Sequence, residues 1–417
     1  MKDRFLLTVA FIIILFPATA SSLSLNGESK TYLQSRETSD SKDITPVFEY
    51  LDFTLRDIGR EEVSFHFGGW ARFKDEEDGG FAKRETGDLQ YAYLSFKKKS
   101  GNAVANLGRL FISEGVALEQ IDGIYKRADL KGGLGAAIFG GVPVETDFDS
   151  RKGDWVYGGR VTHEVPGLYT TGISYLREIN DNDDFREEAG FDIWLLPLDK
   201  VDILGRSSYN IRESGAMEHS YFAALGPFEN FRITPAIYWA DYRRYFTSQT
   251  TDAFTFPASA INPKEQVLIL GSEVSYDFTD NLFASVQYKN HDYDVSGRAD
   301  YYGGRIRYSV TGSGSAGLST YRMYGDEKKL RYLECRIYGS KKFGKADLTA
   351  DLFNVKYDEK VNEVKNAYAA SVAAGYDFTG DIRAVADVEY GRNPFFDEEV
   401  KVFLKFIYKF AVGGGLT

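Results

Sequence analysis

The chain has 417 residues, of which 43% are hydrophobic, 27% charged and 15% aromatic, and its formal net charge is -11. Only residues 5–16 are apolar enough for a membrane helix or a signal sequence, which excludes a polytopic helical membrane protein. The acidic balance, with no concentrated cluster of Lys and Arg, argues against a nucleic-acid partner. The abundance of Gly, Tyr and Phe favours strands and turns over helices.

The first twenty residues have the pattern of a secretory signal peptide. Lys2 and Arg4 form a basic start, an apolar stretch follows, and Ala18-Thr19-Ala20 supplies an A-x-A cleavage site. An uncleaved anchor is disfavoured because the apolar stretch is shorter than the about 20 residues that span a bilayer. We therefore expect residues 1–20 to be removed, residues 21–417 to form one domain, and the protein to be exported.

After residue 20, apolar and polar residues alternate in segments of about ten residues, the period of a strand with one apolar face. In the last of these segments, residues 400–410, alternate side chains form two rows on opposite faces of the expected strand. The first row is Val402, Leu404, Phe406, Tyr408 and Phe410, and the second is Lys401, Phe403, Lys405, Ile407 and Lys409.

Short turns and longer polar stretches alternate along the chain. The ten short turns are expected at 57–62, 97–102, 130–133, 164–167, 197–200, 226–230, 277–281, 311–315, 342–345 and 377–381. The eleven longer loops are expected at 37–46, 74–86, 113–120, 142–153, 179–187, 211–217, 246–264, 293–299, 325–329, 358–364 and 391–397. Short turns on one side and longer loops on the other are typical of an outer-membrane barrel, in which the turns are periplasmic.

These connections predict an all-β fold, a single closed antiparallel transmembrane β-barrel of about 22 strands (20–22). An even strand count that closes on itself leaves no unpaired edge, which a hydrocarbon environment requires. A soluble sandwich or propeller is the alternative, but a propeller needs a motif that recurs at a fixed period, and the sequence has none.

Two features resemble bacterial outer-membrane β-barrel proteins of the porin-like kind. The final strand, ending in Tyr408-x-Phe410, resembles their terminal assembly signal, although seven residues follow Phe410 here. The turns at 276–281 and 376–381 resemble porin periplasmic turns. The resemblance implies a location in the bacterial outer membrane, contact with its lipid, and Tyr408 and Phe410 as the signal that the barrel-assembly machinery recognises.

The expected strand count bears on function, because 22-stranded outer-membrane barrels are usually plugged. Strand pairing is expected to begin near Leu25 or, at latest, Val47, which leaves no room for a plug domain ahead of it. In barrel size, in the missing plug and in segments 31–36 and 48–53, the chain resembles the barrel subunit of porin-cytochrome conduits. That resemblance implies that a multihaem cytochrome sits in the lumen and carries electrons across the outer membrane, with periplasmic and outer-surface multihaem cytochromes as partners.

The chain itself is expected to bind no cofactor. Its single cysteine, Cys335, rules out an internal disulfide and a CxxCH haem site, so any haem would belong to a partner. The alternative function is an open porin for passive diffusion of small solutes or ions, with loop 142–153 or loop 246–264 folded inward as a constriction.

If the apolar face meets lipid, the opposite face lines the lumen. The expected lumen residues are Arg72, Arg160, Arg206, Arg305, Arg307, Glu334, Arg336, Asp347, Asp351, Arg383, Asp387, Lys401, Lys405 and Lys409. Arg383 and Asp387 are expected to pair across strands with the row of three lysines. These residues could form a solute field or a docking surface for a haem protein; the alternative is an ordinary solvated interior.

Catalysis and metal chemistry have little support. The four histidines fall in separate hairpins without an HExxH pair, and no G-x-S-x-G elbow is present. We therefore expect neither catalytic nor metal-ligating residues, and we do not expect an enzyme.

The assignment of faces can be tested at two neighbouring positions. Leu404→Arg should lower the free energy of unfolding by about 2–4 kcal/mol, because a cation near the bilayer midplane loses its hydration. Lys405→Leu should have a much smaller effect, because its side chain faces the lumen. Denaturant unfolding in lipid vesicles measures both, and equal losses would show that the faces are reversed.

Overall fold

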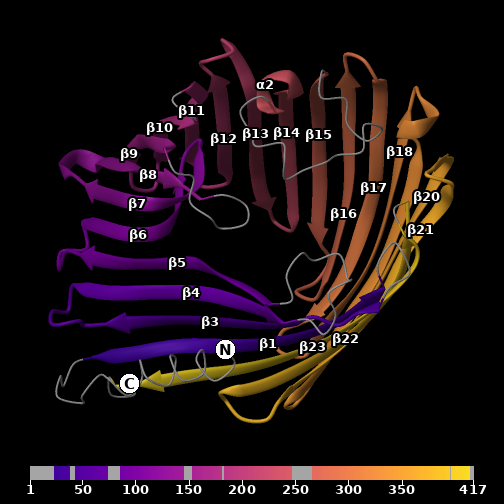
Figure 1. Ribbon diagram of the computed structural model, residues 1–417. Coiled ribbons are helices and arrows are strands. Elements are labelled where there is room, and N and C mark those ends of the chain that lie inside the picture. The colour runs from indigo at the N-terminus through magenta and orange to yellow at the C-terminus, as the bar shows by residue number, and fades with distance from the viewer. Residues whose placement is uncertain are drawn as a thin grey trace.

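The computed structural model describes residues 23–37, 43–73, 85–144, 153–180, 183–246, 265–394 and 396–413. These residues form one continuous antiparallel sheet, rolled into a barrel (Figure 1). The expected signal peptide, residues 1–20, lies outside the described residues.

The strands run in chain order around the barrel, each hydrogen-bonded to the next, except that the short β2 pairs only with β1 and β1 pairs directly with β3. The first eleven are β1 (Ser24–Glu37), β2 (Asp43–Ile44), β3 (Val47–Arg56), β4 (Val63–Phe73), β5 (Glu85–Lys97), β6 (Ala103–Glu114), β7 (Ala117–Asp129), β8 (Leu134–Pro143), β9 (Trp155–Val165), β10 (Tyr169–Asn180) and β11 (Asp183–Leu198). The others are β12 (Val201–Asn210), β13 (Gly215–Phe228), β14 (Phe231–Asp241), β15 (Gln266–Asp277), β16 (Leu282–Tyr293), β17 (Gly297–Val310), β18 (Gly314–Gly325), β19 (Tyr332–Phe343), β20 (Ala346–Val361), β21 (Val364–Asp377), β22 (Ile382–Asn393) and β23 (Phe396–Val412).

Within the described residues, helical structure is limited to short segments in the connections. These are η1 (Lys131–Gly133), α2 (Tyr242–Phe246) and η3 (Lys328–Leu330). None of the helices in the described residues is long and apolar enough to cross a membrane.

The barrel closes where the first strand meets the last. β1 pairs with β23 from Leu25 opposite Val412 to Arg36 opposite Lys401, and its other edge pairs with β3 (Figure 1). The two-residue β2 only extends the pairing of β1, so the wall has 22 strands. The predicted all-β fold and the strand count are confirmed, and no plug-like helical domain occurs in the described residues.

All ten expected short turns lie at one end of the barrel, between strands that pair directly. The prediction of eleven longer loops at the other end was wrong in several places. Strands continue through most of 113–120, 179–187, 358–364 and 391–397. The ends of these strands are rich in polar residues, so their composition resembles that of a loop. Their backbones nevertheless pair with the adjacent strands. Residues 362–363, for example, have φ of 45° and 65°, as in the two-residue hairpin turns that follow strand twist.

The outer face of the wall carries the large apolar side chains. Leu318, Ile337, Val388 and Leu404 are each about half exposed. This is the apolar outward band that lipid contact requires.

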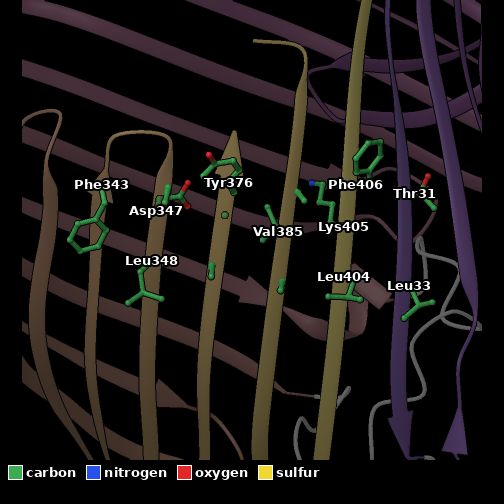
Figure 2. A pocket seen from close by; sticks show the side chains of 15 residues that line it. Thr31, Leu33, Phe343, Asp347, Leu348, Tyr376, Val385, Leu404, Lys405 and Phe406 are labelled. Atoms are coloured by element: carbon green, nitrogen blue, oxygen red, sulfur yellow. The ribbon is translucent and has the colours of Figure 1, made fainter. Parts of the chain in front are cut away.

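A hollow of about 650 Å³ indents this outer face between β19 and β1. Leu348 on β20 and Leu404 on β23 stand on either side of it (Figure 2), and Ala374, Ala384 and Ala386 line it between them. Small side chains therefore leave a groove within the apolar outer band.

The seam between β1 and its neighbours depends on one residue without a side chain. Gly27 lies opposite Phe410 on β23 and Phe53 on β3. A Cβ at this position would lie 2.6 Å from the Phe410 ring and 2.5 Å from the Asp52 carbonyl oxygen. Phe410 therefore packs over Gly27, and the ring that belongs to the expected assembly signal also covers the closure. Its recognition by assembly machinery stays a prediction.

Gly27→Ala should impair closure of the barrel, since overpacking typically costs about 1–3 kcal/mol and here one of the clashing atoms is backbone. The fraction of protein that keeps the compact mobility of an unheated barrel in detergent electrophoresis measures closure. Gly380→Ala is the matched control, because a Cβ there would meet nothing within 4 Å. Equal folded fractions would refute this role of Gly27.

Candidate functional site in the barrel lumen

Contacts between strands that are not neighbours identify the inner face of the wall. Arg160 on β9 reaches Glu114 on β6 at 3.5 Å, and the Val116 N–H, in the turn after β6, donates to Ser174 Oγ on β10 at 3.0 Å. Only the concave side of a curved sheet brings such distant strands together. The face that carries Arg160 therefore lines the lumen.

The register places all fourteen expected lumen residues on this face. Each one stands opposite other lumen-facing residues of the adjacent strands, and the exposed apolar residues alternate with them on the outer face. The assignment of faces that the sequence suggested thus agrees with the strand geometry.

Most of the lumen cations are neutralised by carboxylates on the same or a nearby strand. Arg160 also pairs with Asp192, Arg206 lies 2.9 Å from Glu218, and Arg305 lies 2.9 Å from Glu273.

Arg336 pairs with Asp351 on the adjacent strand, and Glu334 accepts the Tyr301 hydroxyl at 2.6 Å. Arg307 instead lies over the Phe283 ring, 5.1 Å from its centroid. Arg72 and Lys409 stand on the same face, opposite Phe48 and Glu28 respectively.

The expected pairing of Arg383 and Asp387 with the lysine row was wrong. Arg383 instead bonds Asp347 at 2.6 Å and Asp377 at 2.9 Å, both toward the short-turn end. Asp387 stands directly opposite Phe403. Lys401 instead pairs with Glu389, 3.3 Å away and its direct neighbour in the register, and with Glu399 on its own strand at 2.9 Å. The alternation of apolar and polar residues predicted the correct face for these side chains. The register of β22 against β23, however, depends on the length of the connection between them, which the composition did not show.

The sequence also missed a hairpin that folds toward the inside of the barrel. The tip of β6 and β7, residues 110–121, packs against the inner face of β8 to β11, and we call it the infolded hairpin. Its turn is only two residues long, with Gly115 at φ 63°. A Cβ on Gly190 of β11 would lie 2.3 Å from the Val116 side chain, which shows how closely the tip approaches the wall.

Apolar side chains fill the space behind the infolded hairpin. They are Leu110, Ile112, Ala117, Ile121, Phe139, Val156 and Leu176, none more than 5% exposed. A core of this kind is unusual for the inside of a barrel, which is normally polar. A sequence signal existed: Leu110, Phe111 and Ile112 are consecutive apolar residues, so both faces of β6 are apolar there.

Charged groups close off this core. Glu114, 4% exposed, accepts from the Tyr125 hydroxyl at 2.6 Å and lies within 3.5 Å of Arg127 and Arg160. Thus one buried carboxylate ties β6, β7 and β9 together.

A second buried ionic group lies further along the same wall. The Arg186 guanidinium on β11 bonds Glu188 at 2.6 Å and also pairs with Glu119 on β7. The pairing of Arg186 with Glu119 holds the infolded hairpin against β11, which lies four strands from β7 in the sheet.

The two loops that were expected to constrict the lumen fall mostly in residues 145–152 and 247–264, which lie outside the described residues. Within the described part of the chain, no three His, Cys, Asp or Glu side chains are placed to hold a metal ion. In the described part of the chain, the lumen is lined by ion pairs, by the infolded hairpin and by aromatic side chains.

Comparison with solved structures shows what this fold is similar to. The siderophore receptor PirA from Acinetobacter baumannii aligns over 93% of this chain and 80% of its own, with a TM-score of 0.58 and 12% identity. A ferric enterobactin receptor (PfeA) mutant from Pseudomonas aeruginosa aligns over the same shares, with a TM-score of 0.56 and 9% identity. OccK8 (OprE) from Pseudomonas aeruginosa covers 94% of this chain and 98% of its own at a TM-score of 0.46 and 8% identity.

No protein-family model matches the sequence, and no curated protein matches it. At these identities the likeness to solved structures shows the fold alone. The chain has the closed 22-strand barrel of bacterial outer-membrane proteins, and the apolar outer band around a polar lumen fits a location in the outer membrane.

The role of Glu114 gives a stability prediction. Glu114→Gln should lower the free energy of unfolding by about 3 kcal/mol, because it removes the buried carboxylate that Arg127 and Arg160 share. Glu273→Gln, which removes the carboxylate from the more exposed Arg305 pair, should cost at most about 1 kcal/mol. Denaturant unfolding followed by tryptophan fluorescence measures both variants, and similar losses would contradict a special role for Glu114.

Proposed function

We propose that this pore protein is the sheath of an outer-membrane electron conduit, which holds a multihaem cytochrome in its lumen. One observation carries the proposal. The barrel is wide, and the described residues fill only one sector of its interior. Cys335 lies in no haem-attachment motif, so the haem would come with the partner. The proposal assigns no catalytic role to the chain.

Barrel width supports this proposal. With strands ~4.8 Å apart and tilted by about 40°, a 22-strand barrel has a backbone diameter of roughly 45 Å. Barrels of 16–18 strands already leave an aqueous channel, and 22-stranded transporters have a plugged lumen. The infolded hairpin covers only the wall from β6 to β11, so the remaining width suits a protein better than it suits selection among small solutes.

The charge pattern of the lumen points the same way. A pore that selects ions exposes charges of one sign at its narrow part. Here Arg206, Arg305 and Arg336 each have a carboxylate partner, so most cations of the described inner face are neutralised. Such a surface is compatible with protein contact, because few isolated charges would have to be dehydrated.

A second candidate function is an open porin for passive diffusion of small solutes or ions. The infolded hairpin favours it, because this hairpin narrows one side of the lumen with a rigid, internally packed structure.

Purification of the tagged barrel in mild detergent from its native host distinguishes the two functions. A sheath should bring along haem-staining polypeptides in constant proportion to the barrel, and the association should persist through a high-salt wash. An unrelated tagged outer-membrane barrel from the same cells controls for nonspecific capture. A colourless barrel that conducts stably on its own after reconstitution would overturn the sheath and support the porin.

A further inference from the structure

Five aromatic rings form a continuous row across the inner face of four adjacent strands. We call this row the ring strip, and its members are Phe403 on β23, Tyr32 on β1, Phe48 and Tyr50 on β3, and Trp70 on β4. The ring centroids of Phe403 and Tyr32 lie 5.2 Å apart, as do those of Tyr32 and Tyr50. Phe48 lies 6.4 Å from both Tyr50 and Trp70.

The ring strip is unusual because of the face it occupies. Aromatic residues of a transmembrane barrel belong to the outer girdles, whereas the inside is polar. All five strip residues stand on the lumen face, in register with Lys405 and Lys30, and all remain partly exposed. Contiguous exposed apolar surface on one side of a wall marks an interaction site rather than a requirement of the fold.

The hydroxyl groups of Tyr32 and Tyr50 differ from those of Tyr125 and Tyr301 elsewhere on the lumen wall. Tyr125 donates to Glu114 at 2.6 Å, and Tyr301 donates to Glu334 at 2.6 Å. Among the hydrogen bonds of the described residues, none involves the hydroxyl of Tyr32 or Tyr50. These two hydroxyls are available to an outside acceptor, the arrangement that makes tyrosine frequent at protein interfaces.

Basic side chains accompany the strip. Lys405 lies over the Tyr32 ring, 5.1 Å from its centroid, and has no carboxylate partner among the described ion pairs. Arg72 stands opposite Phe48 in the register. Lys30, by contrast, is neutralised by Glu28 and by Asp52 at 3.7 Å. A partner that reaches the strip therefore meets ring faces, free hydroxyls and an uncompensated lysine.

We propose that the ring strip is the surface on which the luminal protein docks, through a segment that carries acidic side chains next to apolar ones. This inference rests on the proposed sheath function and adds the wall and the chemistry of the contact. Trp and Tyr are among the residue types that dominate binding energy at protein interfaces, and Phe is enriched there too. A small solute is a poorer fit, because small ligands are held in concave pockets that enclose most of their surface, and the strip lies on one wall of a wide lumen.

The test compares strip variants with a matched aromatic control in the same pull-down. Trp70→Ala lies on β4, away from the β1–β23 seam, and should reduce the haem-staining polypeptide per folded barrel at least fivefold. Lys405→Glu should give a similar loss through charge repulsion, without removing a ring. Tyr321→Ala is the control: Tyr321 stacks on Tyr301 at 5.2 Å on another part of the lumen wall, and its loss should change the ratio less than twofold.

The outcomes separate this inference from the function on which it rests. Compact mobility in unheated gels shows that each variant is folded, so a lost partner does not reflect a lost barrel. If the unmodified barrel retains no polypeptide, the sheath function itself fails. If it retains the partner and both strip variants retain it equally, only the docking surface is wrong. Block of the purified channel by maltooligosaccharides, abolished by Trp70→Ala, would overturn docking in favour of a solute-binding wall.

Discussion

The constraint on which this structure depends is that every backbone hydrogen bond within hydrocarbon must be made inside the protein. An antiparallel sheet meets it only by closing, so the pairing of β1 with β23 is the decisive contact. Closure brings strands from both ends of the chain together with little tolerance, as the Phe410 ring over Gly27 shows. It also gives every strand one outer face and one lumen face, so neighbouring residues such as Leu404 and Lys405 lie on opposite sides of the wall.

Once the wall is closed, its inner face can differ from sector to sector. From β6 to β11 the infolded hairpin builds a dry core, held by Glu114 and by the pairing of Arg186 with Glu119. From β12 onward, arginine-carboxylate pairs such as Arg336 with Asp351 line the wall. Across the seam, from β23 to β4, partly exposed rings replace them. This unequal lining suits an occupant that meets each sector differently more than it suits a uniform water channel.

The order of short turns and longer loops was enough to predict the barrel and its strand count. Period-two alternation was enough to predict the face of residues such as Arg160 and Lys401, because every strand of such a barrel has one apolar outer face. Features that depend on contacts between distant strands could not be predicted in the same way. Arg383 was assigned the wrong partners because the register follows from the exact ends of the hairpin, and composition blurs those ends. The infolded hairpin depends on Val116 meeting the wall near Gly190, a contact between residues far apart in sequence. The ring strip joins Phe403 to Tyr32 only because the barrel closes.

The central claim is that a protein occupies the lumen against the wall from β23 to β4. Site-directed labelling measures this most directly: Tyr50→Cys, in a background with Cys335→Ser, is treated with a water-soluble maleimide in whole cells and again after purification of the barrel alone. A filled lumen predicts labelling of the purified barrel and protection in cells, while a cysteine in the turn at Gly380 is labelled equally in permeabilised cells and in the purified protein. Equal, rapid labelling of position 50 in both preparations would contradict the account, because it would show that the lumen holds only water.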